Sequence, residues 1–123
     1  MEEYKILTLT KVNIDTYLDS LKEVYYKTFR LALTKQEIKD EFKHLGTWHI
    51  VLRGEVLTAF ALTTGFETIT LLNLGSVKKG DGGILLDSLN INRLFTADYD
   101  LIPYYENHGF KTCSGNTGYM VKV

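Results

Sequence analysis

The sequence has few of the residues that staple or break a fold. Its 123 residues include one cysteine, Cys113, and one proline, Pro103. A single cysteine excludes a disulfide within the chain and is typical of proteins that work in a reducing compartment. No apolar run approaches the roughly 20 residues of a membrane-spanning helix, and the acidic start MEEYK differs from the basic start of a signal peptide. We therefore expect a cytoplasmic protein with no membrane partner.

An excess of charge of one sign is also absent. Fourteen Lys and Arg against fifteen Asp and Glu leave a formal net charge of -1. Proteins that hold nucleic acid mainly by bulk positive charge are clearly basic, so we expect no nucleic-acid partner. The composition is 45% hydrophobic and 24% charged, which is typical of a globular protein. A chain of this length can bury a core without staples, and we expect a single domain over residues 1–123.

The first part of the chain predicts one strand and two helices. Residues 4–9 are apolar and β-prone. Apolar residues then recur every three or four positions over 14–29, which predicts a helix, with Asn13 as its N-cap. Thr34 is followed three residues later by a glutamate, which is the spacing of a capping box. A second helix is therefore expected after it, with Leu45 on its buried side.

A β pattern follows. Gly46 is expected to end the second helix. Two apolar segments, 48–52 and 56–62, flank a turn that contains Gly54, as in a hairpin. A third strand is expected over 68–74.

The remaining elements are short and separated by glycines. Their order is strand, glycine loop, helix, strand, helix and two strands, which predicts an α+β or α/β domain with a mixed sheet. We expect helices over 84–89 and from an N-cap at Asp100 to Gly109, and strands over 93–97, 110–113 and 119–123.

The glycine loop is the least ordinary part of the sequence. Residues 72–89 read LNLGSVKKGDGGILLDSL, in which two lysines precede three glycines within four positions. Glycine lets a backbone approach a ligand, and the first turn of the next helix presents unpaired N–H groups. Lys78 and Lys79 add positive charge beside them. The loop favours phosphate binding, although flexible loops also contain glycine.

A second motif lies about twenty residues further on, where residues 104–110 read Tyr-Tyr-Glu-Asn-His-Gly-Phe. Together with Leu74-x-Ser76-x-x-Lys79-x-x-Gly82, it resembles the GNAT family of acetyl-CoA-dependent N-acetyltransferases. The motifs cover residues 68–111, and the order of elements along the whole chain is similar too. The resemblance implies a mixed, mostly antiparallel central sheet flanked by about four helices. It also implies direct acetyl transfer from acetyl-CoA, as co-substrate, to a small-molecule or protein amine, without a metal.

The resemblance also implies roles for particular residues. Loop N–H groups would cradle the CoA pyrophosphate, and the preceding strand edge would pair with the pantetheine arm and the thioester carbonyl. Tyr105 matches the tyrosine that protonates the departing thiolate, which a phenol with a pKa near 10 can do. Glu67 is the candidate for taking the amine proton, with His49 second. The implied cofactor-binding residues are Asn73, Leu74, Ser76, Lys79, Gly80, Asp81, Gly82, Gly83 and Ile84.

The loop departs from the family pattern in its charge and bulk. Ile84 stands where the family has Gly or Ala, and Asp81 puts a negative charge in a phosphate loop. Asp98 stands where the family often has Asn, before the last helix. The loop departures favour an alternative: a catalytically inactive module of the same fold that acts through a protein partner. A third hypothesis is an interaction protein whose exposed strand edges pair with a partner.

Other residues have simpler interpretations. Tyr105 alternatively is a packed aromatic, and Tyr104, on another side of the helix, is expected in the core. The three histidines, His44, His49 and His108, lack the spacing of metal ligands, so no metal site is predicted.

The acceptor end is the least determined by sequence. By analogy with the family, residues 30–34 and the turn around Gly115 are expected to border it. The sequence leaves the oligomeric state open, a homodimer included.

Overall fold

The computed structural model describes residues 3–113 and 118–123 of the chain, so the turn around Gly115 lies outside the described residues. Seven strands form one sheet in the order β1-β2-β3-β4-β5-β7-β6, and all neighbours are antiparallel except β4 and β5. The elements are β1 (Lys5–Thr8), α1 (Ile14–Phe29), α2 (Lys35–Asp40), β2 (Gly46–Arg53), β3 (Val56–Thr64), β4 (Thr70–Ser76), α3 (Asp81–Ser88), β5 (Arg93–Phe95), α4 (Ile102–Glu106), β6 (Phe110–Thr112) and β7 (Tyr119–Lys122). The expectation of a mixed, mostly antiparallel sheet with about four helices is confirmed. Within the described ranges, no helix combines the length and hydropathy needed to cross a membrane.

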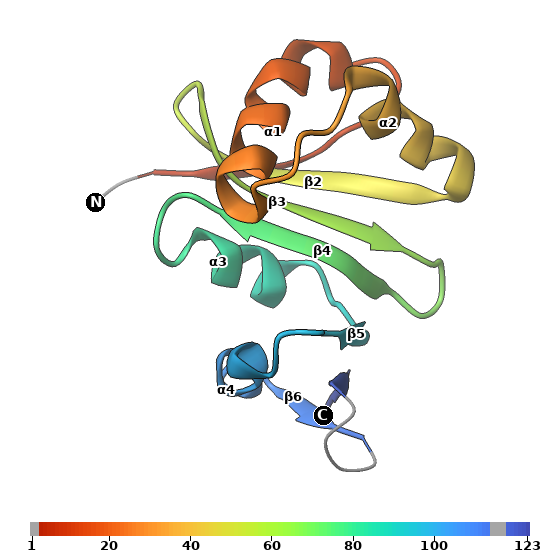
Figure 1. Ribbon diagram of the computed structural model, residues 1–123, viewed down its shortest axis with the longest axis vertical. Coiled ribbons are helices and arrows are strands. Elements are labelled where there is room, and N and C mark those ends of the chain that lie inside the picture. Colours follow the sequence, from red (N-terminus) through yellow and green to blue (C-terminus); the bar gives the residue numbers. More distant parts are fainter. Residues whose placement is uncertain (1–2, 114–117) are drawn as a thin grey trace.

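The sheet separates two apolar cores. Successive residues of a strand point to opposite faces, so Ile50 packs under α1 and α2 while Val51 packs toward α3. On β3, Phe60 belongs to the first core and Ala61 to the second. Figure 1 shows α1 and α2 together on one side of β2–β4 and α3 on the other. The periodic residues of the sequence therefore fill the core on the α1 side as expected.

Of the two N-caps predicted for the first two helices, one is confirmed and the other is not. The capping box is confirmed, because the Thr34 hydroxyl accepts from the Glu37 N–H and the Glu37 carboxylate accepts from the Thr34 N–H, both at 3.0 Å. Asn13 does precede α1, but its side chain does not cap the helix. Its Oδ1 accepts from the Thr10 N–H at 2.7 Å instead. A side-chain hydrogen bond within the preceding turn has replaced the cap.

The end predicted for the second helix is wrong. α2 ends at Asp40 and continues as one 3-10 turn, Glu41–His44. The left-handed stop is Leu45, with φ 62°, and its side chain is 79% exposed rather than buried. Gly46 instead begins β2, where a Cβ would lie 3.0 Å from the Glu41 carbonyl oxygen. Close packing, rather than the helix stop, accounts for this glycine.

Two later boundaries also move. α3 begins at Asp81 rather than at residue 84, because Gly80 takes a left-handed conformation, φ 92°, and turns the chain into the helix early. Asp98, not Asp100, caps the last helical segment, since its Oδ1 accepts from the Asp100 N–H at 3.0 Å. A 3-10 turn, Tyr99–Leu101, comes before α4.

The sheet opens between β4 and β5. These parallel strands are paired only at Thr70–Arg93 and Leu71–Leu94. β4 then continues to Ser76 with its other edge bonded to β3, whereas β5 ends at Phe95. In Figure 1, β5, β6 and α4 lie beyond β4 on the side away from β3. One edge of β4 is therefore left without a neighbouring strand over most of its length.

The hydroxyl of Thr28, on the last turn of α1, gives a test of the packing against β4. Its Oγ1 is buried and makes no hydrogen bond within the described part of the chain. Removing an unsatisfied buried hydroxyl while keeping the shape should stabilise the fold by about 1 kcal/mol. We expect Thr28→Val to raise the free energy of unfolding in urea and the matched Thr28→Ser variant to lower it. A less stable Thr28→Val variant would contradict this account of the interface.

Candidate functional site

Two cavities lie where β4 and β5 separate. The loop cavity has a volume of about 620 Å³ and the strand cavity about 340 Å³. Five residues line both and form their shared wall: Phe29, Leu74, Asp98, Leu101 and Tyr105. The loop cavity is further lined by Thr28, Gly75, Ser76, Val77, Lys78, Lys79, Gly80, Gly82 and Tyr104, and the strand cavity by Leu71, Leu72, Asn73, Leu94, Phe95, Thr96 and Ala97. The two cavities therefore lie next to each other along the open edge of β4, and together we call them the cleft.

The first turn of α3 lies at the mouth of the loop cavity. Gly80 and Gly82 line it, and nothing lies within 4 Å of the position of a Cβ on Gly80. Among the described residues, the N–H groups of Gly82 and Gly83 have no backbone partner, whereas those of Asp81 and Ile84 bond to Lys78 and Gly80 carbonyls. Unpaired N–H groups at a helix start carry partial positive charge and favour an anion. Lys79 lines the same cavity.

Asp81 does not point into this cavity. Its side chain is 1% exposed and turns toward the sheet, where Arg53 Nε and Nη2 donate to its two oxygens at 2.9 and 2.7 Å. The Thr58 hydroxyl donates to the same carboxylate. The Arg53 hydrogen bonds hold the pKa of Asp81 below its usual range despite burial. The charge expected to disfavour a phosphate is therefore paired on the far side of the turn.

Ile84 and Gly83 also lie away from both cavities. Ile84 packs against the apolar core on the α3 side of the sheet. A Cβ on Gly83 would come within 2.7 Å of the His108 ring, so the glycine makes room for that histidine. The His108 ring also reaches Asp87 at 2.9 Å. The bulk of Ile84 therefore does not fill the loop cavity.

Tyr105 is the best-placed ionisable side chain. It extends from α4 into the core, is 8% exposed, and lines both cavities on their shared wall. Burial, followed by the neighbouring Tyr104, raises the pKa of Tyr105 to about 12. Its hydroxyl is therefore protonated at neutral pH, and its side chain lies on the wall that the two cavities share.

Tyr104 is not in the core as expected. Its ring is 36% exposed and lines the loop cavity, where its hydroxyl lies 3.3 Å from the position of a Cβ on Gly82. Burial and then Asp87 raise the pKa of Tyr104. The two adjacent tyrosines thus present one hydroxyl at the start of α3 and one ring deeper on the shared wall.

The strand residues of the predicted set are brought to the cleft. Leu74 and Ser76 line the loop cavity, and Asn73 lines the strand cavity. The Ser76 hydroxyl is already used, since it donates to the Lys78 carbonyl and accepts from the Lys78 N–H. What this part of β4 offers a ligand is its open backbone edge.

The two residues considered for proton abstraction lie elsewhere. Glu67 is exposed in the turn between β3 and β4 and lines neither cavity. His49 lies on β2 between the hydroxyls of Thr8 and Thr63, at 2.9 and 3.1 Å. Burial lowers the pKa of His49.

The sequence did not indicate that Asp98 would lie at the candidate site. Among the described residues, it is the only carboxylate that lines either cavity. Its sequence signal was its place before the last helix, where it is now seen to cap the 3-10 turn. No sequence signal pointed to Phe29 or Leu101, which reach the shared wall from α1 and from that turn.

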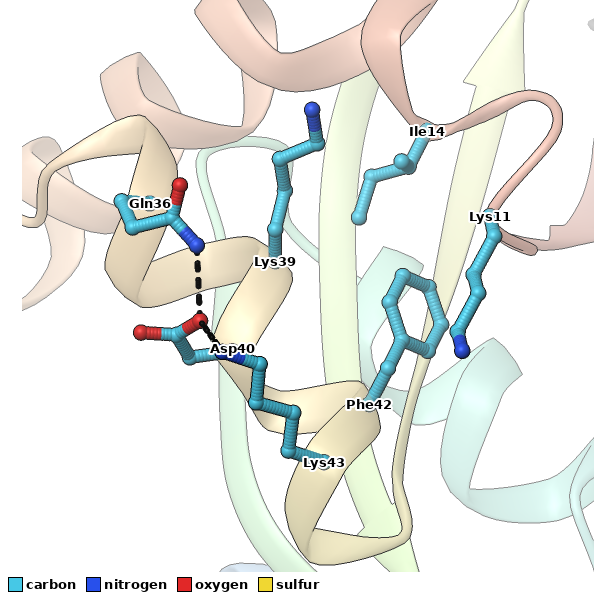
Figure 2. Close-up of a pocket in the computed structure, with 7 residues that line it drawn as sticks. All are labelled: Lys11, Ile14, Gln36, Lys39, Asp40, Phe42 and Lys43. Atoms are coloured by element: carbon cyan, nitrogen blue, oxygen red, sulfur yellow. Dashed lines mark hydrogen bonds and ion pairs between the residues drawn. The ribbon is translucent and has the colours of Figure 1, made fainter.

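A separate hollow lies beside α2 and contains none of the predicted site residues. It has a volume of about 280 Å³ and is lined by Lys11, Ile14, Gln36, Lys39, Asp40, Phe42 and Lys43. Figure 2 shows the Gln36 amide facing Asp40, to which it donates at 2.7 Å, with Lys43 beside the same carboxylate at 3.3 Å. Lys39 is paired with Asp15 at 2.9 Å. These are exposed ion pairs of a helix surface, which contribute little to stability.

No group of three or more His, Cys, Asp or Glu side chains in the part of the chain that the structure describes is arranged to hold a metal ion.

Comparison with solved structures identifies the fold. The ribosomal-protein-S18-alanine N-acetyltransferase from Escherichia coli matches with a TM-score of 0.69 at 15% identity, over 97% of this chain and 90% of that one. The PaiA N-acetyltransferase from Thermoplasma acidophilum, in complex with coenzyme A, matches with a TM-score of 0.62 at 16% identity, over 98% of both chains. An acetyltransferase from Streptococcus agalactiae matches with a TM-score of 0.65 at 16% identity, over 100% and 99%.

No protein-family model matches the sequence, and no curated protein sequence is similar to it. The likeness is therefore one of fold: the chain has the fold of GNAT acetyltransferases, as the sequence motifs predicted.

The raised pKa of Tyr105 predicts a loss of stability in alkali. An unfolded tyrosine ionises near pH 10, whereas Tyr105 keeps its proton to about pH 12. Between these values the unfolded state loses the proton first, so stability falls as pH rises, by up to roughly 3 kcal/mol for this group. We expect unfolding in urea at pH 8 and pH 11 to show a smaller loss for Tyr105→Phe than for wild type. Tyr26→Phe, at a half-exposed ring, is the control, and equal losses in all three proteins would contradict the prediction.

Proposed function

We propose that this chain is an acetyltransferase that binds acetyl-CoA in the cleft and acetylates an amine. The observation that carries the proposal is the cleft itself, in which an anion-favouring helix start and a buried, protonated tyrosine lie along one open strand edge. Its residues fit the ligand. The loop cavity offers the Gly82 N–H group, Lys79 and a volume of about 620 Å³, and neither Asp81 nor Ile84 lines it. The likeness to acetyltransferases of the same fold supports this assignment.

The phosphate end of the ligand is assigned to the start of α3. The N–H group of Gly82 and the charge of Lys79 favour a diphosphate there. The Tyr104 hydroxyl lies beside the same turn and is a further donor. The open edge of β4 at Asn73 and Leu74 is suited to hydrogen bonds with an extended amide-containing arm.

The chemical end is assigned to the shared wall. Bound acetyl-CoA supplies an acyl thioester that an amine can attack. Tyr105 holds its proton at Oη and donates a hydrogen bond where a thiolate would depart. Full transfer from a pKa of about 12 to an alkyl thiolate, which is a weaker base, would be uphill. We therefore assign Tyr105 to stabilise the thiolate by hydrogen bonding rather than by complete protonation.

Asp98 is assigned to the amine proton. It is the carboxylate on the shared wall, so it is placed to attract a cationic amine and to accept the proton that the amine must lose. Glu67 lies in the β3–β4 turn, outside both cavities. The proposal extends to a single-domain cytoplasmic enzyme whose acceptor is a small-molecule or protein amine.

Asp81 and Ile84 were the two main reasons for the hypothesis of a catalytically inactive module, and their positions do not support it. Asp81 is neutralised by Arg53, and Ile84 packs in the core rather than in the cavity. Neither residue then prevents a diphosphate from reaching the start of α3.

Replacing one hydroxyl tests the function. Tyr105→Phe should lower turnover about 100-fold, because one preorganised donor to a developing anion is lost. Acetyl-CoA affinity should change less than about threefold, since the ring remains in place. Turnover is measured as release of free thiol from acetyl-CoA with a panel of primary amines and peptides.

The control for this test is Glu67→Gln, which we expect to keep wild-type turnover because Glu67 lies outside both cavities. Unchanged turnover in Tyr105→Phe would contradict the role of the tyrosine. A wild-type protein that does not bind acetyl-CoA would contradict the function itself.

A further inference from the structure

Asp81, at the start of α3, forms a buried ion pair with Arg53. The direction of the Asp81 side chain is not explained by general stability. Asp81 lies between Gly80 and Gly82, which both line the loop cavity, yet its own side chain points the opposite way. A carboxylate with 1% exposure on the first turn of a helix would be costly to bury if it were unpaired. Here three donors meet it: Arg53 Nε, Arg53 Nη2 and the Thr58 hydroxyl. Each oxygen therefore has a partner.

The strands are shaped to supply these donors. The β2–β3 register skips one residue, because Val51 faces Ala59 and Leu52 faces Leu57, so Thr58 is left as a bulge. A bulge redirects a side chain locally, and the Thr58 hydroxyl reaches Asp81 across 23 residues of sequence. Its carbonyl also accepts from the Val77 N–H at 2.9 Å, just before the loop. The same bulge is thus bonded to both ends of the glycine turn.

Arg53 is itself held in place. It is the last residue of β2, its side chain is 19% exposed, and its guanidinium lies over the Tyr4 ring at 5.5 Å. The bidentate geometry fixes the carboxylate plane, which a point charge would not do. The pair therefore sets both the position of the turn and the net charge beside the loop cavity.

We propose that Arg53, Asp81 and Thr58 form an anchor that positions the first turn of α3 for a diphosphate. Asp81 ties the turn to β2 and β3, so that Gly80 and Gly82 face the loop cavity. Arg53 cancels the charge that would otherwise repel the anion. The three are positioning residues that act through the Gly82 N–H group and touch no ligand themselves. The inference rests on the proposed function, since it takes the diphosphate of CoA as the occupant.

The experiment separates anion recognition from general folding. CoA, and pantetheine as the same arm without phosphates, are titrated into wild type, Arg53→Gln and the double variant Arg53→Gln/Asp81→Asn. Lys111→Gln removes one positive charge at an exposed position of β6, outside both cavities, and is the matched control. Circular dichroism confirms that each variant is folded. Arg53→Lys, which keeps the charge but loses the bidentate geometry, is used if Arg53→Gln does not fold.

The expected result is selective. Arg53→Gln should weaken CoA binding about tenfold, because Asp81 is left uncompensated beside the anion, and should change pantetheine binding less than twofold. The double variant should regain at least threefold of the lost CoA affinity, since the repelling charge is gone. If Arg53→Lys replaces the single variant, it should also weaken CoA more than pantetheine.

Other results would overturn the inference. Equal weakening for both ligands would mean that the pair only supports the fold, and unchanged CoA binding would mean that it supports no anion site. A double variant no better than Arg53→Gln would show that charge cancellation is not its role. If wild type binds no CoA, the proposed function fails and the inference fails with it, whereas wild-type binding with unchanged variants overturns the inference alone.

Discussion

The early separation of β4 and β5 is the constraint on which the site depends. The two strands are joined through two residue pairs and then part, while β4 stays hydrogen-bonded to β3 along its other edge. The pairing with β3 fixes the register of the open edge. Residues from α1, β4, β5 and α4 can then line one cleft, although they are far apart in sequence. A fully paired sheet would have no room for a ligand at this place.

At the start of α3, an acidic residue lies in a turn that favours an anion, and the two do not conflict. The Gly80 conformation begins the helix at Asp81, which turns that carboxylate toward Arg53 on the sheet. The flanking glycines add no side chain of their own to the cavity side of the turn, where the Tyr104 hydroxyl lies beside Gly82. The charge of Asp81 is thus paired on one side of the helical turn, and the backbone faces the cavity on the other side.

Local features of the fold were readable from the sequence, and long-range ones were not. Periodicity and the capping box at Thr34 predicted the helices and hairpin, because they depend on neighbouring residues. The Tyr105 motif gave the fold despite low identity to the solved structures. The stop at Leu45 was missed because packing against Glu41, not helix ending, requires Gly46.

For the candidate site, too, the sequence indicated the local features and missed the long-range contacts. Sequence placed Leu74, Lys79, Gly80 and Gly82 beside one another, and the structure brings them to one cavity. It offered no means of knowing that Asp81 meets an arginine 28 positions away, since that pairing depends on the β2–β3 bulge. The sequence identified the loop, but it could not show which way the side chains of the loop point.

The central claim is that the cleft between β4 and α3 binds coenzyme A. Its most direct test is a titration of ¹⁵N-labelled protein with CoA, followed by NMR of the backbone amides. We predict saturable shifts that are largest at Gly80 and Gly82 and along Asn73–Ser76. Saturable shifts centred on the hollow beside α2, or no shifts at millimolar CoA, would contradict it.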